Sequence, residues 1–305
     1  RTGRTFEDWL DDRLTQVAVG WILACVFVRF GEDNGLIDEA RIAGPGLRGR
    51  EARDAQQRYF TEHPHSNDRE YLQHVFRVAA GLRGLDGIVG EGESPLWLVD
   101  PPADAATRLL TLFRTADNSG HVRHDFTDPE LSTRFLGDLY QDLSEAARER
   151  YAVLQTPEFV ESFILDRTLT PALDIYTLEE VDLIDPTCGS GHFLLGAFER
   201  LAPRWLRKLP GNVNVALQEV LNRIAGIDLN PYAVVIARFR LLIAALKMAQ
   251  VHKLRLAPDF HLHIETGDSL LHGFDQRDYT RAQATLGLNN PQENLGDGAD
   301  HRYGH

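Results

Sequence analysis

The segment from Asp182 to Leu195 constrains the fold more than any other part of this 305-residue chain. Apolar residues from Val181 to Ile184 predict a buried strand, a turn with two glycines follows, and an apolar helix begins after the turn. A glycine-bearing turn between a strand and a helix is how a nucleotide-type ligand site is built at the carboxyl edge of a parallel sheet. The segment therefore predicts an α/β fold with a ligand site at this turn.

The residues of the turn indicate which ligand it suits. Gly189 and Gly191 lack Cβ atoms, so the backbone can take unusual dihedral angles and a ligand can approach it closely. Asp185 places a carboxylate at the strand tip, which suits an ammonium group, and Phe193 offers an apolar wall. The spacing matches neither the dinucleotide pattern of three glycines nor a phosphate loop ending in Gly-Lys-Ser or Gly-Lys-Thr. We therefore expect a ligand with an amino-acid end rather than a pyrophosphate.

A second predicted strand, Ile224 to Asp228, also ends in a carboxylate, and Asn230 and Pro231 open the long helix after it. An acid at the tip of the second strand can hold a ribose diol, because one carboxylate accepts both hydroxyl hydrogens. Asp228 lies further from the glycine turn than is usual in dinucleotide folds, since two helices are predicted between them. An acid at a strand end is often only a helix cap, but the glycine turn upstream favours the ribose contact.

Composition excludes several classes of protein. With only two cysteines, Cys25 and Cys188, a disulfide scaffold or a cysteine-based zinc site is not expected, and the cytoplasm is the favoured compartment. The apolar run from Val17 to Val28 is too short to span a bilayer and predicts a buried helix, so we expect no membrane partner. His261 and His263 have no cysteine or cluster of carboxylates nearby, so we expect no metal site.

The net charge of -13 is unlike that of a DNA-binding surface, because duplex binding uses lysine and arginine to neutralise phosphates. Two interpretations stay open: the DNA-binding surface lies outside this sequence, or the protein does not bind DNA. One region is locally basic but is diluted by acidic residues, and we favour a solvated helical face there. Its arginines are Arg41, Arg48, Arg50, Arg53, Arg58, Arg69, Arg77 and Arg83.

The length and the pattern of apolar residues predict more than one domain. We expect a mostly α-helical domain over residues 1–134, an α/β core over 135–275, and a flexible or loop tail over 276–305 that is rich in Asn, Gln, Gly and Asp. Within the core, Thr156 is placed to cap a helix that has Pro157 at its first position.

The motif also carries a resemblance. Asp185 to Leu194, which reads Asp-Pro-Thr-Cys-Gly-Ser-Gly-His-Phe-Leu, is similar to the S-adenosylmethionine-binding motif of N6-adenine DNA methyltransferases. Around it the chain, including Leu136 to Ser144, resembles the N-terminal part of the large PglX methyltransferases of BREX phage-defence systems. The resemblance runs through nearly all 305 residues. It implies a Rossmann-like class I methyltransferase core that is incomplete at its C-terminal side.

The resemblance implies S-adenosyl-L-methionine as the cofactor. In the family a Thr-Pro pair contacts the methionine end of the cofactor, and here Gln155 stands where an aromatic residue often precedes that pair. Asp268 takes the position that accepts a hydrogen bond from the adenine amino group, and Leu270 takes one that lines the adenine pocket. The expected cofactor-binding residues are Thr156, Pro157, Asp185, Thr187, Cys188, Gly189, Ser190, Gly191, Phe193, Asp228, Asp268 and Leu270.

The catalytic half of the expected site has no counterpart in the sequence. Methyl transfer to an exocyclic amine needs acceptors for the amine and a ring that stacks on the extruded base. In the resembled enzymes an Asn-Pro-Pro-aromatic turn supplies both. These 305 residues contain no such tetrapeptide, and Asn289 to Gln292 is a poor substitute. We therefore expect the sequence to stop before the catalytic turn, so that the chain binds the cofactor but does not methylate DNA unaided.

The leading interpretation is the N-terminal, cofactor-binding portion of a site-specific N6-adenine DNA methyltransferase in BREX-type phage defence. Such a protein would reach double-stranded DNA through regions outside this chain and could contact other BREX proteins. Alternatives are a cofactor-binding interaction subunit of a defence complex without catalysis, the methyltransferase part of a restriction-modification enzyme, or a methyltransferase for RNA or a small molecule.

Overall fold

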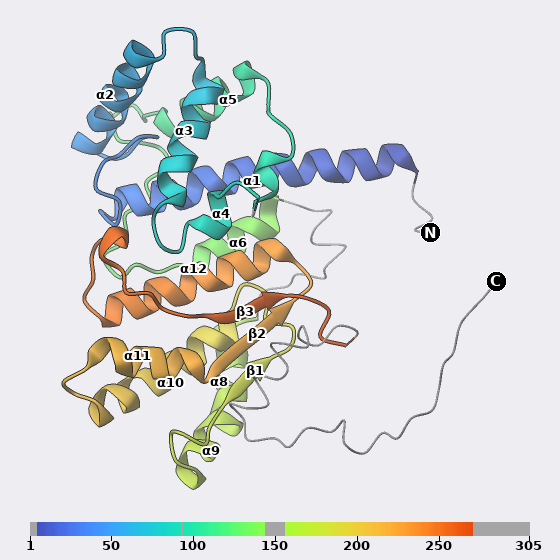
Figure 1. Cartoon of the computed structure of the whole chain (residues 1–305), viewed down its shortest axis with the longest axis vertical. Helices are drawn as coiled ribbons and strands as arrows, with labels where there is room; N and C mark the ends of the chain where they lie inside the picture. Colours follow the sequence, from blue (N-terminus) through green and yellow to red (C-terminus); the bar gives the residue numbers. More distant parts are fainter. Residues whose placement is uncertain (1–4, 93, 144–155, 271–305) are drawn as a thin grey trace. The chain divides into compact units, whose positions relative to one another are not determined.

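The computed structural model describes residues 5–92, 94–143 and 156–270 (Figure 1). The chain forms two compact units, Arg1–Thr266 and Gly267–His305. The first unit mixes helices with a small parallel sheet, as the predicted α/β class requires. The expected tail and Asn289 to Gln292 lie outside the described residues, and the expected domain boundary after residue 134 stays a prediction.

Helices make up the described part of the chain before residue 144. They are α1 (Phe6–Asp33), α2 (Leu47–Glu62), α3 (Asp68–Ala80), α4 (Asp86–Val89), α5 (Ala103–Arg114), α6 (Arg134–Leu143) and the 3-10 turn η1 (Pro95–Trp97). The glycines and prolines from Gly81 to Pro102 predict a loop, and that prediction is wrong in part. Helices α4 and η1 form there, and their apolar residues Ile88, Val89 and Leu96 are buried in the core.

Helix α1 is a core helix. The run from Val17 to Val28 is expected to be too short to span a bilayer, but the helix that contains it is long and apolar enough to cross a membrane. Its apolar window is nevertheless 72% buried inside the fold. Val17, Phe27 and Val28 are each at most 6% exposed, which confirms the predicted buried helix. Burial of such a stripe is the main source of helix stability in a globular domain.

Three short parallel strands form the sheet in the order β1-β2-β3. They are β1 (Leu183–Asp185), β2 (Ile224–Asp228) and β3 (His263–Thr266), preceded by α8 (Glu158–Arg167) and α9 (Leu169–Ile175) and connected by α10 (His192–Lys208), α11 (Val213–Asn222), α12 (Pro231–Met248) and η2 (Leu254–Leu256). Because neighbouring strands are parallel, their carboxyl ends meet at one edge of the sheet. This edge is where the expected ligand site belongs.

The two faces of the sheet differ in burial. On one face Ile224 and Ile264 are fully buried, and a Cβ at Gly226 would lie 2.7 Å from Leu194 of α10. The register pairs Ile184 with Ala225 and Ala225 with His263, so these three residues share the opposite face. Ile184 is 54% exposed and His263 is exposed, so this row is open to solvent within the described residues.

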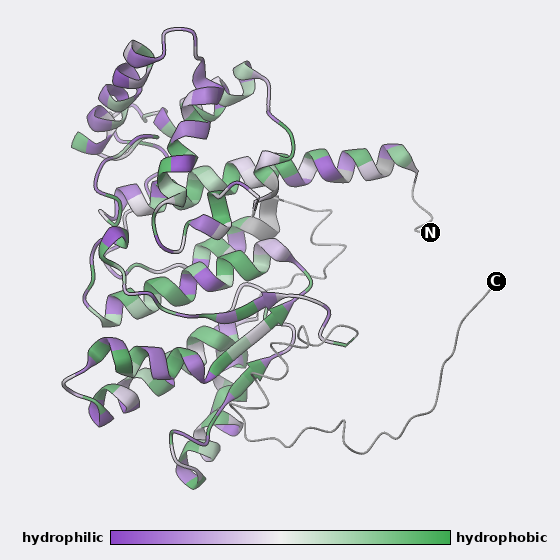
Figure 2. Ribbon diagram, in the orientation of Figure 1, coloured by the Kyte–Doolittle hydropathy of each residue, from purple (hydrophilic) through white to green (hydrophobic). Residues whose placement is uncertain are grey.

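Helix α12 contributes to two hydrophobic cores. Asn230 caps it by accepting a hydrogen bond from the Tyr232 N–H, and Pro231 begins it, as predicted. Ile236, Phe239 and Leu242 belong to the core of the helical region, whereas Ala237, Leu241 and Ala245 belong to the core around the sheet. Figure 2 shows α12 largely in the hydrophobic colour and α2 largely in the hydrophilic one.

The locally basic region is paired within the chain. Each of the following arginines forms an ion pair with an acidic residue: Arg41, Arg48, Arg58, Arg69, Arg77 and Arg83. The partners are Glu39, Glu51, Glu70, Glu91 and Asp259. Such mutual pairing is the pattern of a solvated helical face, the interpretation favoured from the sequence.

Candidate cofactor-binding site

Two carboxylates stand at the ends of neighbouring strands. Asp185 is the last residue of β1 and Asp228 the last residue of β2. Burial raises the pKa of Asp185, and the nearby charge of Asp228 raises it further, against a hydrogen bond from the Thr187 N–H that lowers it. Two carboxylates at the ends of neighbouring strands favour a cationic ligand, because a positive charge offsets their mutual repulsion.

The loop between β1 and α10 is held on the tip of β2. The Cys188 N–H donates to the Ile227 carbonyl at 2.9 Å, and the Gly189 N–H donates to Asp228 Oδ2 at 2.8 Å. Asp228 Oδ1 accepts a second bond, from the Asn230 N–H, also at 2.8 Å. Each carboxylate oxygen has a further lone pair, so Asp228 can still accept hydroxyl hydrogens. One carboxylate oxygen of Asp228 therefore holds the loop, and the other holds the N-cap residue of α12.

Both glycines of the loop adopt left-handed backbone conformations, with φ of +51° at Gly189 and +83° at Gly191. This confirms the unusual dihedral angles expected there. A Cβ at Gly191 would also lie 2.9 Å from the Cβ of Ala237 in α12, whereas one at Gly189 would meet no atom within 4 Å. Gly191 therefore serves close packing, and Gly189 leaves open space at the loop.

A cavity of about 520 Å³ lies beside β1. It is lined by Ile164, Leu165, Thr168, Leu169, Ala172, Val181, Asp182, Leu183, Ile184, Asp185, Pro186 and Phe193. Its volume is typical of small-molecule sites. The cavity includes the expected site residues Asp185 and Phe193, but Gly189 and Asp228 do not line it. The described site thus has an apolar part along β1 and a polar part at the loop.

The predicted cap at Thr156 is wrong by one residue. Helix α8 begins at Glu158, and Pro157 rather than Thr156 occupies the N-cap position, with no side-chain capping bond. The Pro157 carbonyl accepts the N–H groups of Val160 and Glu161, and proline fits there because this position needs no N–H bond of its own. Thr156 is half-buried and Pro157 exposed, and neither lines the cavity.

Of three further motif residues, Thr187 is exposed to solvent, whereas Cys188 and Ser190 are buried. Thr187 is exposed, and the Cys188 thiol is buried, which raises its pKa. Ser190 is 8% exposed, and its hydroxyl accepts a hydrogen bond from Arg240 Nη1 at 3.2 Å. The side chain of Ser190 therefore points toward α12, so a cofactor contact from this residue would have to come from its backbone.

Two buried polar residues behind the loop were missed by sequence reasoning. Arg240 of α12 is 3% exposed, and His192 at the start of α10 is 8% exposed. Burial, followed by the charge of Arg240, lowers the pKa of His192 to about 4, so the imidazole is neutral at pH 7. The only signal in the sequence was an arginine within the apolar stretch of α12, which does not name its partner.

The adenine-contact residues predicted from the resemblance belong to the second unit, Gly267–His305. Within it, the Leu270 N–H donates to Asp268 Oδ1 at 2.9 Å, which is a local Asp turn. The roles of Asp268 and Leu270 at a cofactor stay predictions.

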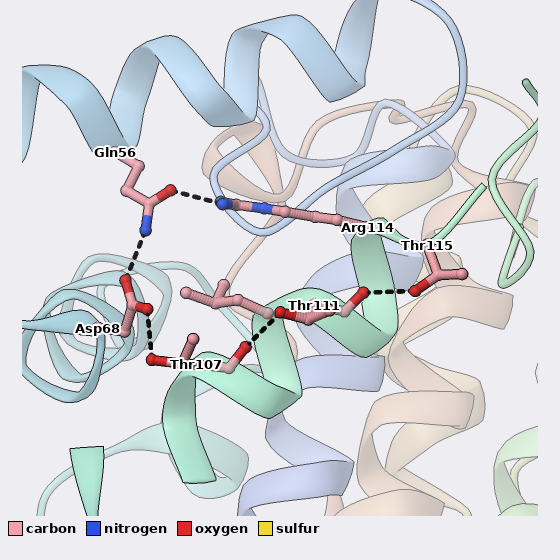
Figure 3. Close-up of a pocket in the computed structure, with 7 residues that line it drawn as sticks. Gln56, Asp68, Thr107, Thr111, Arg114 and Thr115 are labelled. Atoms are coloured by element: carbon pink, nitrogen blue, oxygen red, sulfur yellow. Dashed lines mark hydrogen bonds between the residues drawn. The ribbon is translucent and has the colours of Figure 1, made fainter. Parts of the chain in front are cut away.

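A second cavity of about 250 Å³ lies among α2, α3 and α5 and contains none of the expected site residues (Figure 3). A chain of hydrogen bonds lines it. Gln56 accepts from Arg114 and donates to Asp68 at 2.7 Å, and Asp68 also accepts from the Thr107 hydroxyl at 2.7 Å. Gln56, Asp68, Thr107 and Arg114 each bond to another side chain of this network, so the network connects α2, α3 and α5.

Comparison with known proteins finds similarity to DNA methyltransferases. Residues 172–273 match the family model described as MmeI, DNA-methyltransferase domain. Over 292 residues the chain is 46% identical to the adenine-specific methyltransferase PglX of Streptomyces coelicolor. This alignment covers 91% of this chain and 24% of that protein. The resemblance predicted from the motifs is therefore confirmed for the quarter of PglX that the chain spans.

Two further proteins are similar to this chain at lower sequence identity. A putative type II restriction enzyme and methyltransferase of Methanocaldococcus jannaschii, RM.MjaORFECS2P, is 30% identical over 199 residues, or 59% of this chain and 16% of that protein. The structure of the type IIL restriction-modification enzyme MmeI in complex with DNA aligns with a TM-score of 0.41 at 15% identity, covering 88% of this chain and 39% of that one.

Proposed function

We propose that this chain is the cofactor-binding portion of an adenine-N6 DNA methyltransferase, which transfers the methyl group of S-adenosylmethionine to adenine in DNA. The similarity to PglX and to the MmeI methyltransferase domain supports this class of reaction. The observation that carries the proposal is the pairing of Asp185 and Asp228 at adjacent strand tips around a loop of left-handed glycines. Two acids and no phosphate-binding lysine suit a cationic, phosphate-free cofactor.

Each part of the cofactor has a candidate partner. Asp185 would hold the ammonium group of the methionine end, and Phe193 the apolar wall beside it. Asp228 would accept the ribose hydroxyls, because both of its oxygens keep a lone pair beyond the bonds to the loop and to α12. Asp268 and Leu270 would contact the adenine. The three parallel strands would then be part of a Rossmann-like sheet.

The base-acceptor half of the reaction has no candidate in this sequence, since no Asn-Pro-Pro-aromatic tetrapeptide occurs in it. We propose that the complete enzyme contacts double-stranded DNA through residues outside this chain and acts in the cytoplasm in BREX-type defence. A cofactor-binding subunit without catalysis is the second candidate. The methyltransferase of a restriction-modification enzyme would share the same cofactor site.

Calorimetric titration of the 305-residue chain with S-adenosylmethionine tests the cofactor assignment. We expect Asp228→Asn to weaken binding roughly tenfold or more, because one amide oxygen replaces two charged acceptors. The matched control is Asp104→Asn on α5, whose carboxylate is exposed and should leave the affinity unchanged. A folded wild-type chain that binds no S-adenosylmethionine would contradict the proposal.

Transfer of a labelled methyl group to duplex DNA separates the two candidates. The chain alone should give no labelled DNA under either candidate. Addition of a polypeptide that supplies an Asn-Pro-Pro-aromatic turn should restore transfer if the chain is part of the enzyme. Persistent inactivity together with tight cofactor binding would favour the non-catalytic subunit.

A further inference from the structure

We propose that Arg240 of α12 is a positioning residue for the loop Cys188–Gly191, and that its guanidinium sets the backbone geometry on which cofactor binding depends. The inference rests on the proposed function, since the loop is the proposed cofactor contact. Arg240 lies 50 residues from Ser190 in sequence, and nothing in the loop motif indicates it.

The guanidinium acts on one peptide group of the loop. Arg240 Nη1 donates to the Ser190 carbonyl at 2.6 Å and to the Ser190 hydroxyl at 3.2 Å. The same peptide group carries the Gly191 N–H, which donates to the Cys188 carbonyl at 2.8 Å. Both ends of this peptide are therefore fixed, one of them by a charged donor, and charge-assisted hydrogen bonds are the stronger kind.

A second contact from the same helix reinforces the first. Ala237 lies three residues before Arg240, so the two side chains share one face of α12. A Cβ at Gly191 would approach the Ala237 Cβ to 2.9 Å, so the helix packs directly on the left-handed glycine. The helix thus meets the loop at two consecutive residues, Ser190 and Gly191, and fixes its position as well as its orientation.

Helix α6 closes the other side of Ser190. A Cβ at Gly137 would lie 2.6 Å from the Ser190 hydroxyl oxygen and 3.6 Å from Arg240 Nη1. Only glycine fits at this position without displacing the hydroxyl. Ser190 is therefore enclosed between α6 and α12, and its carbonyl has little freedom to rotate away from the arginine.

The free-energy cost of burying the Arg240 guanidinium indicates that its charge serves a purpose other than stability. A buried guanidinium is expensive, and an apolar side chain of similar volume is often at least as stabilising. Its Nε has no hydrogen-bond partner among the described residues. Burial and the nearby charge of Arg134 lower the pKa of Arg240 to about 10, and the carboxylates of Asp138, Glu161 and Glu199 oppose this, so the side chain is protonated at neutral pH.

The test compares Arg240→Met with Arg240→Lys and a control. Methionine fills much of the volume but removes every donor, whereas lysine keeps a charged donor near the Ser190 carbonyl. The control is Leu242→Ala on the same helix, because Leu242 is 4% exposed and belongs to the other core. Two properties are measured on the 305-residue chain: amide hydrogen exchange of peptides covering residues 187–192, and the affinity for S-adenosylmethionine.

We expect Arg240→Met to speed exchange in these peptides and to weaken the affinity roughly tenfold, the loss of one charge-assisted hydrogen bond. Arg240→Lys should recover part of both. Leu242→Ala should lower the melting temperature while leaving loop exchange and affinity unchanged. A purely structural arginine predicts the opposite: all three variants lose stability, and loop exchange follows stability alone.

Each outcome decides the inference. If Arg240→Met folds with unchanged loop exchange and affinity, the inference is wrong. If Arg240→Met does not fold, Arg240→Gln, which loses the charged donor, replaces it, and unchanged exchange and affinity in that variant overturn the inference. If the wild type binds no S-adenosylmethionine but Arg240→Met still loosens the loop selectively, the proposed cofactor is wrong whereas the positioning of the loop by Arg240 stands.

Discussion

At the scale of single residues, Glu32 near the end of α1 is an acid held inside the core of the helical region. It is fully buried, and its carboxylate accepts the N–H groups of Arg41 at 2.6 Å and Ile42 at 3.1 Å. Burial raises its pKa to about 7, although these donors and the charge of Arg29 act in the opposite direction. The folded protein therefore holds the Glu32 proton more tightly than the unfolded chain does.

This difference predicts a dependence of stability on pH. The contribution of Glu32 is complete below the unfolded pKa of 4.5 and is lost as the pH rises through about 7. Between these values it should lower the free energy of unfolding by at most about 1.4 kcal/mol per pH unit. Urea denaturation at pH 5, 6, 7 and 8 measures this slope. The Glu32→Gln variant should lack it, and the exposed control Glu51→Gln should keep it; equal slopes in all three proteins would contradict the prediction.

The sequence predicted residues whose role follows from their place in a strand or turn. Asp185 and Asp228 were identified because an acid that ends an apolar run lies at the sheet edge in any parallel α/β fold. Arg240 and the inward orientation of Ser190 were not, because they depend on which face of α12 packs against the loop. Such contacts across 50 residues leave no periodic signal in one sequence.

At the scale of elements, the start of α10 depends on two glycines for different reasons. Gly189 has a positive φ in open space, whereas Gly191 combines a positive φ with a close approach to α12. Some helices and strands were predictable, since β2 and the start of α12 match their expected residues. The short elements α4 and η1 were missed because glycines and prolines recur around them from Gly81 to Pro102, whereas tertiary burial stabilises them.

Alanine at each glycine separates the two causes. Gly189→Ala should destabilise the chain by about 1–2 kcal/mol, the usual cost of a left-handed conformation for a residue with a Cβ atom. Gly191→Ala should cost about 2–4 kcal/mol, because overlap with Ala237 adds to the same backbone term. Chemical denaturation of both variants measures the difference. Gly211→Ala is the control, since a Cβ there meets no atom within 4 Å and its φ is not positive. Equal losses at Gly189 and Gly191 would show that packing on α12 is unimportant.

At the scale of the whole described fold, α12 links the helical region to the sheet. Phe239 packs against Phe27 and Phe30 of α1, with ring centroids 4.9 and 6.1 Å apart, while Leu241 and Ala245 pack toward the sheet. This sharing was not visible in the sequence, where α12 is apolar on all sides and its partners are unknown. Separate folding of the regions on either side of residue 134 would leave one face of α12 without its core.

A piece covering residues 135–305 should therefore lack a cooperative thermal transition, because its α12 would expose Ile236, Phe239 and Leu242 to water. The whole chain should melt in one transition that both core regions share. Circular dichroism and calorimetry of the two proteins test this. A sharp melting transition in the isolated piece would contradict it and would favour two independent domains.

The shared helix also determines how far the effect of a small molecule can reach. A ligand that binds only the folded chain raises the free energy of unfolding by RT ln(1 + [L]/Kd) for everything that unfolds together. Helices α1 to α6 would then resist proteases and heat better when a cofactor occupies the strand tips, although they lack the tip carboxylates. The concentration of such a ligand would in this way set the lifetime of the entire folded unit, including helices that never contact it.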